Sequence, residues 1–392
     1  MSILFISNNN FSSGLSGGDR IFLELLRLWS KIEPCGLMGS VETKALLDKY
    51  KLPNIKFYQT SGKNHHVFPN TYNIVVHQIS RTVKAKIYTL LHLIELTKYT
   101  TVYSVSDFFP DLIPALIIKI FKPNIKLICG FYLLAPNPND PNSPYIKNHQ
   151  VIKNYLYFYF QKINLLLIKL FANIVFVTSD PDIKLFSHKK VVVVRGGVDT
   201  TTSSKWLSQQ TLKPPKSRKF LACFVGRLHP QKGILILIDI WKLVVAHYPK
   251  AKLAIIGNGQ LEEELIAKIN QLKLNKNIQL FGFVDGLEKE SIFRDSAIIV
   301  HPATFDSGGM AAAEAMAWGL PGVSFDLLSL KSYYPKGMIK AKKDNLVDFA
   351  DNIIKLYRNP KLYKKISNEA TTLIQSSWEW SQRAQDIYSQ IN

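Results

Sequence analysis

Residues 297–325 read AIIVHPATFDSGGMAAAEAMAWGLPGVSF. Ala297–Val300 and Gly322–Phe325 are short, largely apolar runs, as expected of strands that are covered on both faces. Between them, Gly309–Trp318 is rich in alanine, the residue with the highest helix propensity. A strand, a helix and a second strand in this order predict a parallel pair of strands with the helix as their crossover.

The same alternation continues on both sides of this segment. An alternating order of short apolar runs and longer helical stretches predicts an α/β fold with Rossmann-like, doubly wound parallel sheets. The other predicted strands are Ile3–Ile6, Ile55–Tyr58, Asn73–Val76, Thr101–Val105, Lys126–Cys129, Ile174–Val177, Val191–Val194, Phe220–Val225, Lys252–Ile256 and Ile278–Phe281. The other predicted helices are Asp19–Ser30, Val83–Thr97, Ile152–Phe171, Gly233–His247 and Gln260–Gln271.

The length of 392 residues favours two domains, at about 100–200 residues per domain. A stretch rich in Thr, Ser, Lys and Pro runs from Asp199 to Arg218 and is typical of a linker. We therefore predict one Rossmann-like domain over residues 1–198 and a second over 199–375. Open parallel sheets bind ligands beyond the carboxyl ends of their strands, so we expect both domains to face one cleft.

Composition excludes several classes of protein. Hydrophobic residues make up 47% and charged residues 20%, which is a globular balance. Cys35, Cys129 and Cys223 have no Cys or His at ligand spacing, which argues against a disulfide scaffold and a zinc module. No run of 18 uncharged apolar residues occurs, and polar Asn8 closely follows the first apolar run. We expect neither a spanning helix nor a secretory signal, and therefore a cytoplasmic protein.

The charge indicates an anionic partner. Lys and Arg total 49 and Asp and Glu total 29, so the net charge is 49 − 29 = +20. Such an excess favours phosphorylated ligands, an acidic membrane surface or nucleic acid. Nucleic acid is not expected, because no basic stripe with exposed aromatic residues or recognition module is visible. The lysine-interleaved stretch Ile152–Phe171 suits the inner face of a membrane, although a buried helix of the sheet layer is the alternative.

Two loops in the second half suit a phosphate. Gly308 and Gly309 precede a helix, where bare backbone N–H groups and the helix dipole favour an anion. Arg227 and Lys232 follow another predicted strand, and two cations there suit a pyrophosphate. A tight turn with small residues, or a solvated turn, is the alternative for each loop. Glu314 lies in the second turn of the alanine-rich helix, within reach of the hydroxyl groups of a sugar.

Two further glycine turns follow predicted strands. Gly17 and Gly18 stand before the first helix, and Gly257 stands in Gly257-Asn258-Gly259. The spacing GxGxxG is absent, so nicotinamide dinucleotide binding is not supported, and the Walker pattern is absent as well.

Together these motifs resemble the retaining GT-B glycosyltransferases of family 4, also called glycosyl transferases group 1. The resemblance is dense over about residues 190–340 and diffuse in the first half. It rests on Gly226-Arg-Leu228 with Lys232-Gly233, Gly257-Asn-Gly259, Phe281-Gly-Phe-Val284, and Asp306-x7-Glu314 continuing into Ala-Met-Ala-x-Gly-x-Pro. It also includes Val194-Arg-Gly-Gly-Val-Asp199, which resembles the usual entry to the second domain of that family.

The resemblance implies a hexosyltransferase that takes its sugar from a nucleoside-diphosphate sugar and needs no cofactor or metal. The acceptor would be a glycan or a lipid-linked molecule, and the helix 376–392 would return to the first domain. The catalytic residues would be Arg227 and Lys232 on the diphosphate and Asp306 facing the hexose. The residues binding the rest of the donor would be Glu314 on the ribose, Phe283 beside the base, Gly308 and Gly309 on the phosphate, and Gly17, Gly18 and Gly257.

The sequence departs from the family pattern at two places. Asp306 stands where the family has Glu, so the carboxylate is one methylene closer to the backbone. A histidine that many members carry in the first domain is missing from Cys129-Gly-Phe-Tyr-Leu-Leu134, and Tyr132 or Asp107 would line that space. A nucleotide-sugar epimerase of the same fold and an inactive nucleotide-sugar-binding relative therefore stay open as alternatives.

Overall fold

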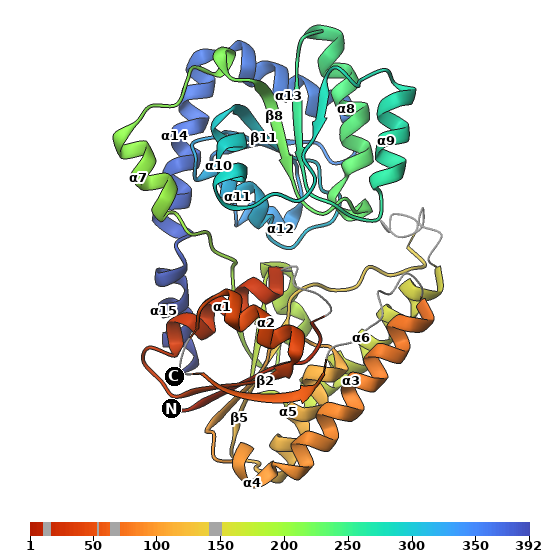
Figure 1. Cartoon of the computed structure of the whole chain (residues 1–392), viewed down its shortest axis with the longest axis vertical. Helices are drawn as coiled ribbons and strands as arrows, with labels where there is room; N and C mark the ends of the chain where they lie inside the picture. The colour runs from red at the N-terminus through yellow and green to blue at the C-terminus, as the bar shows by residue number, and fades with distance from the viewer. Residues whose placement is uncertain (11–16, 53–54, 63–70, 141–150) are drawn as a thin grey trace. The chain divides into compact units, whose positions relative to one another are not determined.

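The computed structural model describes residues 1–10, 17–52, 55–62, 71–140 and 151–392 (Figure 1). The chain forms two compact units, Met1–Gly196 with Arg383–Asn392, and Gly197–Gln382. The first division lies two residues before the predicted boundary at 198. In this division the return to the first unit begins at Arg383, seven residues after the predicted start at 376.

The first unit is built on a seven-stranded sheet in the order β3-β2-β1-β4-β5-β6-β7. Every neighbouring pair is parallel, as predicted. Its centre is fully buried, because Ile3–Ser7 and Thr101–Ser104 are covered on both faces. The strands are β1 (Ile3–Ser7), β2 (Cys35–Ser40), β3 (Lys56–Ser61), β4 (Thr101–Ser104), β5 (Lys126–Phe131), β6 (Ile174–Val177) and β7 (Lys190–Val193).

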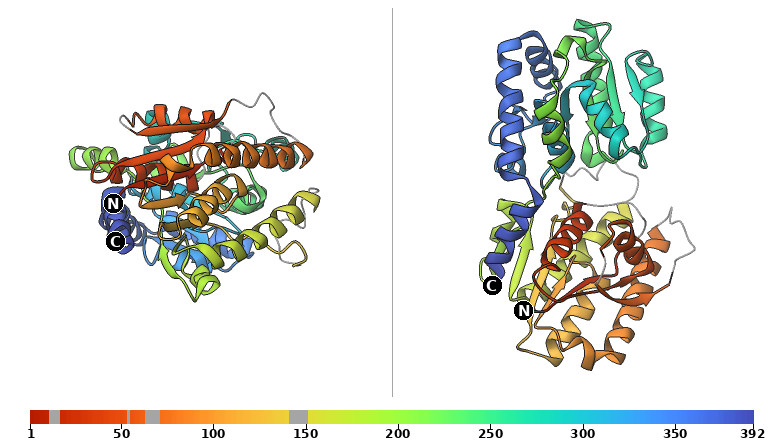
Figure 2. Two further views of the ribbon diagram at one scale, coloured as in Figure 1. Left: turned by 90° about the horizontal axis from the view of Figure 1, so that it is seen from below. Right: turned by 60° about the vertical axis from the view of Figure 1, so that its left-hand side comes forward.

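Helices cover both faces of this sheet (Figures 1 and 2). On one face α5 packs between α3 and α6, in contact with both. On the other, the indole N–H of Trp29 at the end of α1 donates to the carbonyl of Ala384 at 3.0 Å. The helices are α1 (Gly17–Trp29), α2 (Val41–Lys49), α3 (Thr71–Leu91), α4 (Leu93–Leu96), α5 (Phe109–Phe121), α6 (Val151–Phe171) and the 3₁₀ helix η1 (Asp180–Phe186).

Two sequence-based predictions for this unit are wrong. Asn73–Val76 was predicted as a strand, but these residues form the first turns of α3. Three consecutive apolar residues, Ile74 to Val76, cannot distinguish a buried strand from a helix, and here they continue into a longer helical period. The strand β2, Cys35–Ser40, was not predicted, because its two glycines and lack of β-branched residues weaken the strand pattern.

The second unit is built on a six-stranded parallel sheet in the order β10-β9-β8-β11-β12-β13. Its strands are β8 (Phe220–Val225), β9 (Leu253–Ile256), β10 (Ile278–Leu280), β11 (Ser296–His301), β12 (Gly322–Phe325) and β13 (Met338–Ala341), the last of which was not predicted. Its helices are α7 (Thr201–Gln209), η2 (Pro215–Ser217), η3 (Pro230–Lys232), α8 (Ile234–His247), α9 (Glu262–Gln271), α10 (Gly286–Arg294), α11 (Met310–Met316), α12 (Leu328–Lys331), α13 (Leu346–Arg358) and α14 (Pro360–Ser377).

The predicted linker is part of the second unit. Within Asp199–Arg218, the helix α7 packs on the unit through Trp206, whose ring lies 5.9 Å from that of Trp318. Thr200 is tied to Glu379 by a side-chain hydrogen bond of 2.7 Å. Although residues 199–218 are rich in Ser, Thr and Pro, they therefore do not form a separate linker between domains.

The last helix, α15 (Trp380–Ile391), is divided between the units. Trp378, just before it, is buried against Tyr333 and Tyr334 of the second unit, with ring centroids 5.5 and 5.2 Å away. This packing explains why the second unit extends past residue 375.

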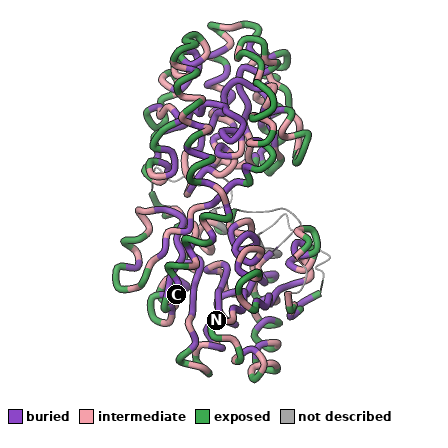
Figure 3. The backbone as a smooth tube through the Cα atoms, turned by 90° about the vertical axis from the view of Figure 1, so that its left-hand side faces the viewer, coloured by how far each residue is buried: buried purple, intermediate pink, exposed green. Residues whose placement is uncertain are grey.

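Burial follows the layers. Figure 3 shows buried residues in the interior of each unit and exposed residues on the outside of each unit. The three cysteines are buried and free. Among the described residues, no helix has the length and apolar content needed to cross a membrane.

Candidate functional site

In the second unit, the loops that follow β8, β9 and β10 are joined through their main chains. The N–H of Gly226 donates to the carbonyl of Ile256 at 3.0 Å, and the N–H of Gly257 donates to the carbonyl of Gly282 at 2.7 Å. All three loops lie at the carboxyl ends of parallel strands, where open α/β sheets bind their ligands. The predicted motifs around Arg227, Gly257 and Phe283 are therefore neighbours within this unit.

Two glycines in these loops, Gly257 and Gly233, allow a close approach to a backbone carbonyl that a side chain would block. Gly257 has φ +136°, and a Cβ there would lie 1.9 Å from the carbonyl oxygen of Gly226. Gly233 has φ +65°, and a Cβ there would lie 2.0 Å from the carbonyl oxygen of Pro302. The loop after β8 is thus pressed against the loops after β9 and β11.

Asp306 is the centre of the polar contacts in this region. Its Oδ2 lies 2.5 Å from Nζ of Lys232 and 3.1 Å from Nε2 of His301. Its Oδ1 accepts the backbone N–H groups of Gly308 and Gly309 at 3.2 and 3.1 Å. Four groups, from the loop after β8, the end of β11 and the loop after β11, therefore converge on one carboxylate, whose side chain is only 8% exposed.

The protonation of Asp306 follows from these contacts. Burial alone would raise the pKa of this carboxyl, but the charge of Lys232 and the contact with His301 hold the pKa well below its ordinary value of 3.8. Asp306 is therefore negatively charged at neutral pH, and Lys232 balances that charge.

A second group of side chains holds the Asp306 loop in place. Ser329 Oγ donates to the carbonyl of Asp306, and the Tyr334 hydroxyl donates to the carbonyl of Gly309 at 2.6 Å. The ammonium of Lys340 lies 5.1 Å from the centre of the Tyr334 ring. Burial lowers the pKa of Lys340 to about 8. Sequence reasoning missed these residues and His301, because only the packing of β11, α12 and β13 brings them to the loop.

Glu314 has a cation as its partner. Its Oε2 accepts from Nζ of Lys289 at 3.0 Å, and the same ammonium lies 2.7 Å from Asp285. Burial lowers the pKa of Lys289, but the two carboxylates outweigh it and the net direction is upward. Lys289 is 25 residues before Glu314 and carries no motif, so the sequence offered no signal for the pair.

The other predicted residues have different surroundings. Arg227 is exposed, and its guanidinium forms no ion pair with any residue in the described ranges. Phe283 is 66% exposed in the loop before α10. Gly17 and Gly18 open α1 in the first unit, and their predicted role stays a prediction. Within the described part of the chain, no three His, Cys, Asp or Glu side chains are grouped to hold a metal.

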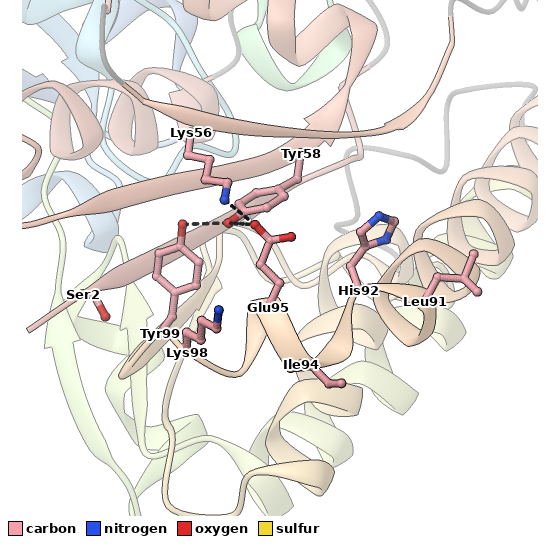
Figure 4. Close-up of a pocket in the computed structure, with 9 residues that line it drawn as sticks. All are labelled: Ser2, Lys56, Tyr58, Leu91, His92, Ile94, Glu95, Lys98 and Tyr99. Atoms are coloured by element: carbon pink, nitrogen blue, oxygen red, sulfur yellow. Dashed lines mark hydrogen bonds and ion pairs between the residues drawn. The ribbon is translucent and has the colours of Figure 1, made fainter.

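The first unit has a pocket of about 520 Å³ that contains none of the predicted residues (Figure 4). It lies beside the amino ends of β1 and β3, away from the strand ends where a ligand is expected. Lys56 is already paired with Glu95, and the hydroxyls of Tyr58 and Tyr99 are 3.2 Å apart. The lining residues are Ser2, Lys56, Tyr58, Leu91, His92, Ile94, Glu95, Lys98 and Tyr99.

The carboxyl ends of β1 and β4 hold buried carboxylic acids. Asp111 accepts the backbone N–H groups of Asn8 and Asn9 at 2.5 and 3.1 Å, and burial raises its pKa to about 7. Asp107 accepts from Gln161 at 2.9 Å, and burial raises its pKa to about 6. Tyr132 lies in the segment that lacks the family histidine, and its hydroxyl forms a hydrogen bond with the hydroxyl of Tyr103.

Comparison with known proteins shows what the second unit is similar to. Residues 207–373 match the family model for glycosyl transferases group 1. The poly(glycerol-phosphate) alpha-glucosyltransferase of Bacillus subtilis is 28% identical over 173 residues, which cover 43% of this chain and 25% of that protein. The match thus spans only a quarter of the length of that relative.

Solved structures resemble the whole chain. The structure of Anabaena HepE in complex with UDP and glucose has a TM-score of 0.68 at 16% identity, with 99% of this chain and 98% of that chain covered. The sucrose-phosphate synthase of Thermosynechococcus elongatus has a TM-score of 0.74 at 12% identity, with 99% and 97% covered. At such identities the likeness concerns the fold, which is that of the GT-B glycosyltransferases. Over residues 207–373, the second unit of this chain therefore matches the glycosyl transferases group 1 family, and the two parallel sheets of the chain, one in each unit, have the GT-B fold.

Proposed function

We propose that this protein transfers a hexose, with retention of configuration, from a nucleoside-diphosphate sugar to a glycan or lipid-linked acceptor without a metal. One observation carries the proposal: Lys232 and the backbone N–H groups of Gly308 and Gly309 together hold an anion, the Asp306 carboxylate. Groups that hold a carboxylate in this way also suit a phosphate oxygen.

In the proposed reaction, Lys232 and the backbone N–H groups of Gly308 and Gly309 bind the leaving group. The bond between the anomeric carbon and the diphosphate oxygen breaks, and the diphosphate leaves with the electron pair. The acceptor hydroxyl forms the new glycosidic bond and passes its proton to an oxygen of the departing diphosphate. Negative charge grows on the departing diphosphate, where Lys232 and Arg227 stabilise it in place of a metal cation. Arg227 is exposed in the loop after β8, so its guanidinium is accessible to a ligand there.

Donor binding requires a change of partners at Asp306. Lys232 and the two glycine N–H groups cannot fully serve both the carboxylate and a phosphate. We therefore propose that the diphosphate takes over these donors and that Asp306 turns to the hexose, with His301 still beside it. In α11, Glu314 would bind the ribose while Lys289 holds its charge.

The names of similar proteins suggest which donor to test first. The Bacillus subtilis relative is named as a glucosyltransferase, and the HepE structure contains UDP and glucose. UDP-glucose is accordingly the first donor, with the other nucleoside-diphosphate hexoses as comparisons.

The test is a calorimetric titration with UDP and other nucleoside diphosphates, followed by product analysis. Wild-type protein should bind at least one nucleoside diphosphate, and Lys232→Ala should lose that affinity. Lys364→Ala removes an exposed lysine from α14 and should change nothing. Release of free nucleoside diphosphate with an acceptor supports transfer. Conversion of the donor to an epimer supports the epimerase, and binding without turnover supports an inactive relative.

A further inference from the structure

The outer face of α3 is apolar although it is exposed. Val76, Ile79, Val83, Ile87 and Leu90 are separated by three or four residues, and all are more than 40% exposed. At about 100° per residue they fall within a stripe about 80° wide. Leu91, at its end, is 76% exposed. An apolar stripe of this length normally faces a partner.

The outer face of α6 has the same character. Ile152, Tyr159, Ile163, Leu166 and Leu170 are exposed and share one side of the helix, at intervals of seven, four, three and four residues. Both helices pack on α5, on the same face of the sheet (Figure 1). The helix layer of the first unit thus presents two apolar stripes, which we call the α3–α6 surface.

Lysines border both stripes. Lys84 and Lys86 are exposed and lie on the two sides of the α3 stripe, because Lys86 is about 20° beyond Ile79 and Lys84 is about 20° beyond Leu91. Lys162 and Lys169 are exposed and border the α6 stripe on one side. Aliphatic side chains with lysines at their edge are typical of helices that lie in a membrane interface.

Acidic residues are missing from this part of the sequence. Neither residues 49–94 nor residues 141–179 contain an Asp or a Glu. A second copy of this chain on the same surface would therefore bring lysine against lysine without carboxylates to balance them. An anionic bilayer offers acyl chains to the apolar stripes and lipid phosphates to the lysines.

We propose that the α3–α6 surface docks the protein on an anionic lipid bilayer, with the two apolar stripes in the headgroup and acyl boundary. This surface is separate from the candidate site in the second unit, so the proposal does not depend on the proposed reaction. It adds α3 to the membrane-facing helix that the sequence suggested at Ile152–Phe171.

The experiment is vesicle co-sedimentation of the full chain. Vesicles of phosphatidylcholine alone are compared with vesicles of equal parts phosphatidylcholine and phosphatidylglycerol. We expect binding to the anionic vesicles, weaker binding at high salt, and little binding to the neutral ones. Equal binding to both kinds of vesicle, or to neither, would overturn the proposal.

Matched variants locate the surface. Lys84→Gln/Lys86→Gln should weaken binding by about 25-fold, at about fivefold per lysine. Lys364→Gln/Lys365→Gln removes the same charge from exposed positions of α14 and should have much less effect. Equal losses in the two pairs would mean that only net charge matters, which would contradict the proposal.

The apolar part is tested in the same way. Ile87→Ser/Leu91→Ser should weaken binding by about tenfold or more, because two exposed aliphatic side chains lose their burial in the bilayer. Ile266→Ser/Val347→Ser alters two exposed aliphatic residues of the second unit and should leave binding unchanged. A dimer that Ile87→Ser/Leu91→Ser dissociates, without vesicle binding by the wild type, would assign the surface to a second copy and overturn the proposal.

Discussion

In the second unit, the loops after β8, β9, β10 and β11 are held together by main-chain contacts, and polar side chains converge on Asp306. In the first unit, the unusual residues lie on the outer faces of α3 and α6, and most of the exposed large apolar side chains of the described residues belong to this unit. Both units have parallel sheets with helical layers. The same architecture therefore serves a compact polar site in one unit and an extended apolar surface in the other.

The difference shows where a single sequence is informative. Tight loops restrict residue type and spacing, because a glycine or a charged group must stand at one position. An exposed helix face tolerates any aliphatic residue, so it has periodicity but no motif. Variants in the two units should accordingly have separable effects.

The largest expected effect is on chemistry in the second unit. Lys232→Ala should reduce the proposed transfer rate by about 10²–10³-fold, because the charge that develops on the leaving diphosphate loses its nearest cation. Turnover of the donor is the measurement. Ile87→Ser/Leu91→Ser should leave turnover of a soluble acceptor unchanged, and a comparable loss in that variant would break the division between the units.

The next effect concerns stability. Gly233→Ala should lower the free energy of unfolding by about 2–4 kcal/mol, since its φ is +65° and its Cβ would lie 2.0 Å from the carbonyl oxygen of Pro302. Gly62→Ala in the first unit is the control, because a Cβ there meets nothing within 4 Å. Urea unfolding of both variants measures the difference. Similar stabilities would mean that the loop after β8 is not tightly held.

A smaller effect distinguishes the two carboxylates of the site. Glu314→Gln should weaken nucleoside-diphosphate binding by about tenfold, since the expected ribose contact is lost and the Lys289 ammonium keeps only Asp285. Asp306→Asn should keep or increase that affinity, because Lys232 is released for the phosphate, while turnover falls. Calorimetric affinity and turnover are measured together. If Asp306→Asn lost affinity as severely as Glu314→Gln, the assigned roles would be wrong.

The smallest effects are on pH dependence, and their signs differ between the units. The pKa of Lys340 is about 8 in the folded protein, below its ordinary 10.5. The unfolded chain binds more protons between these values, so Lys340 makes the free energy of unfolding rise with pH from about 8 to 10.5. Lys340→Met should remove that rise.

Asp111 in the first unit acts in the opposite direction. Its pKa is about 7 in the folded protein, above its ordinary 3.8. The folded chain binds more protons between these values, so Asp111 makes the free energy of unfolding fall as pH increases from 3.8 to about 7. Asp111→Asn should flatten this slope in urea titrations. A slope that either variant leaves unchanged would contradict the assigned burial of that group.

The sequence predicted the parallel fold, because short apolar runs alternate with helical stretches. Lys232 was assigned to a diphosphate from its loop position, and Asp306 was assigned to the hexose of the same ligand from the family resemblance. The two side chains lie 2.5 Å apart. His301, Lys289 and Tyr334 were not found, because their roles depend on contacts between distant elements. The α3 stripe was missed because a four-residue window at Asn73–Val76 was interpreted as a strand.

The divided helix α15 determines the order in which the two units are completed during synthesis. The second unit is continuous in sequence from Gly197 to Gln382, whereas the first is completed only by Arg383–Asn392. On a ribosome, residues 1–196 emerge before the synthesis of the segment that supplies the Ala384 carbonyl to Trp29 and the Ile391 carbonyl to Lys126. The first unit, although translated first, is therefore the last to be completed, and until then the α1 face of its sheet is open to chaperones or to misfolding.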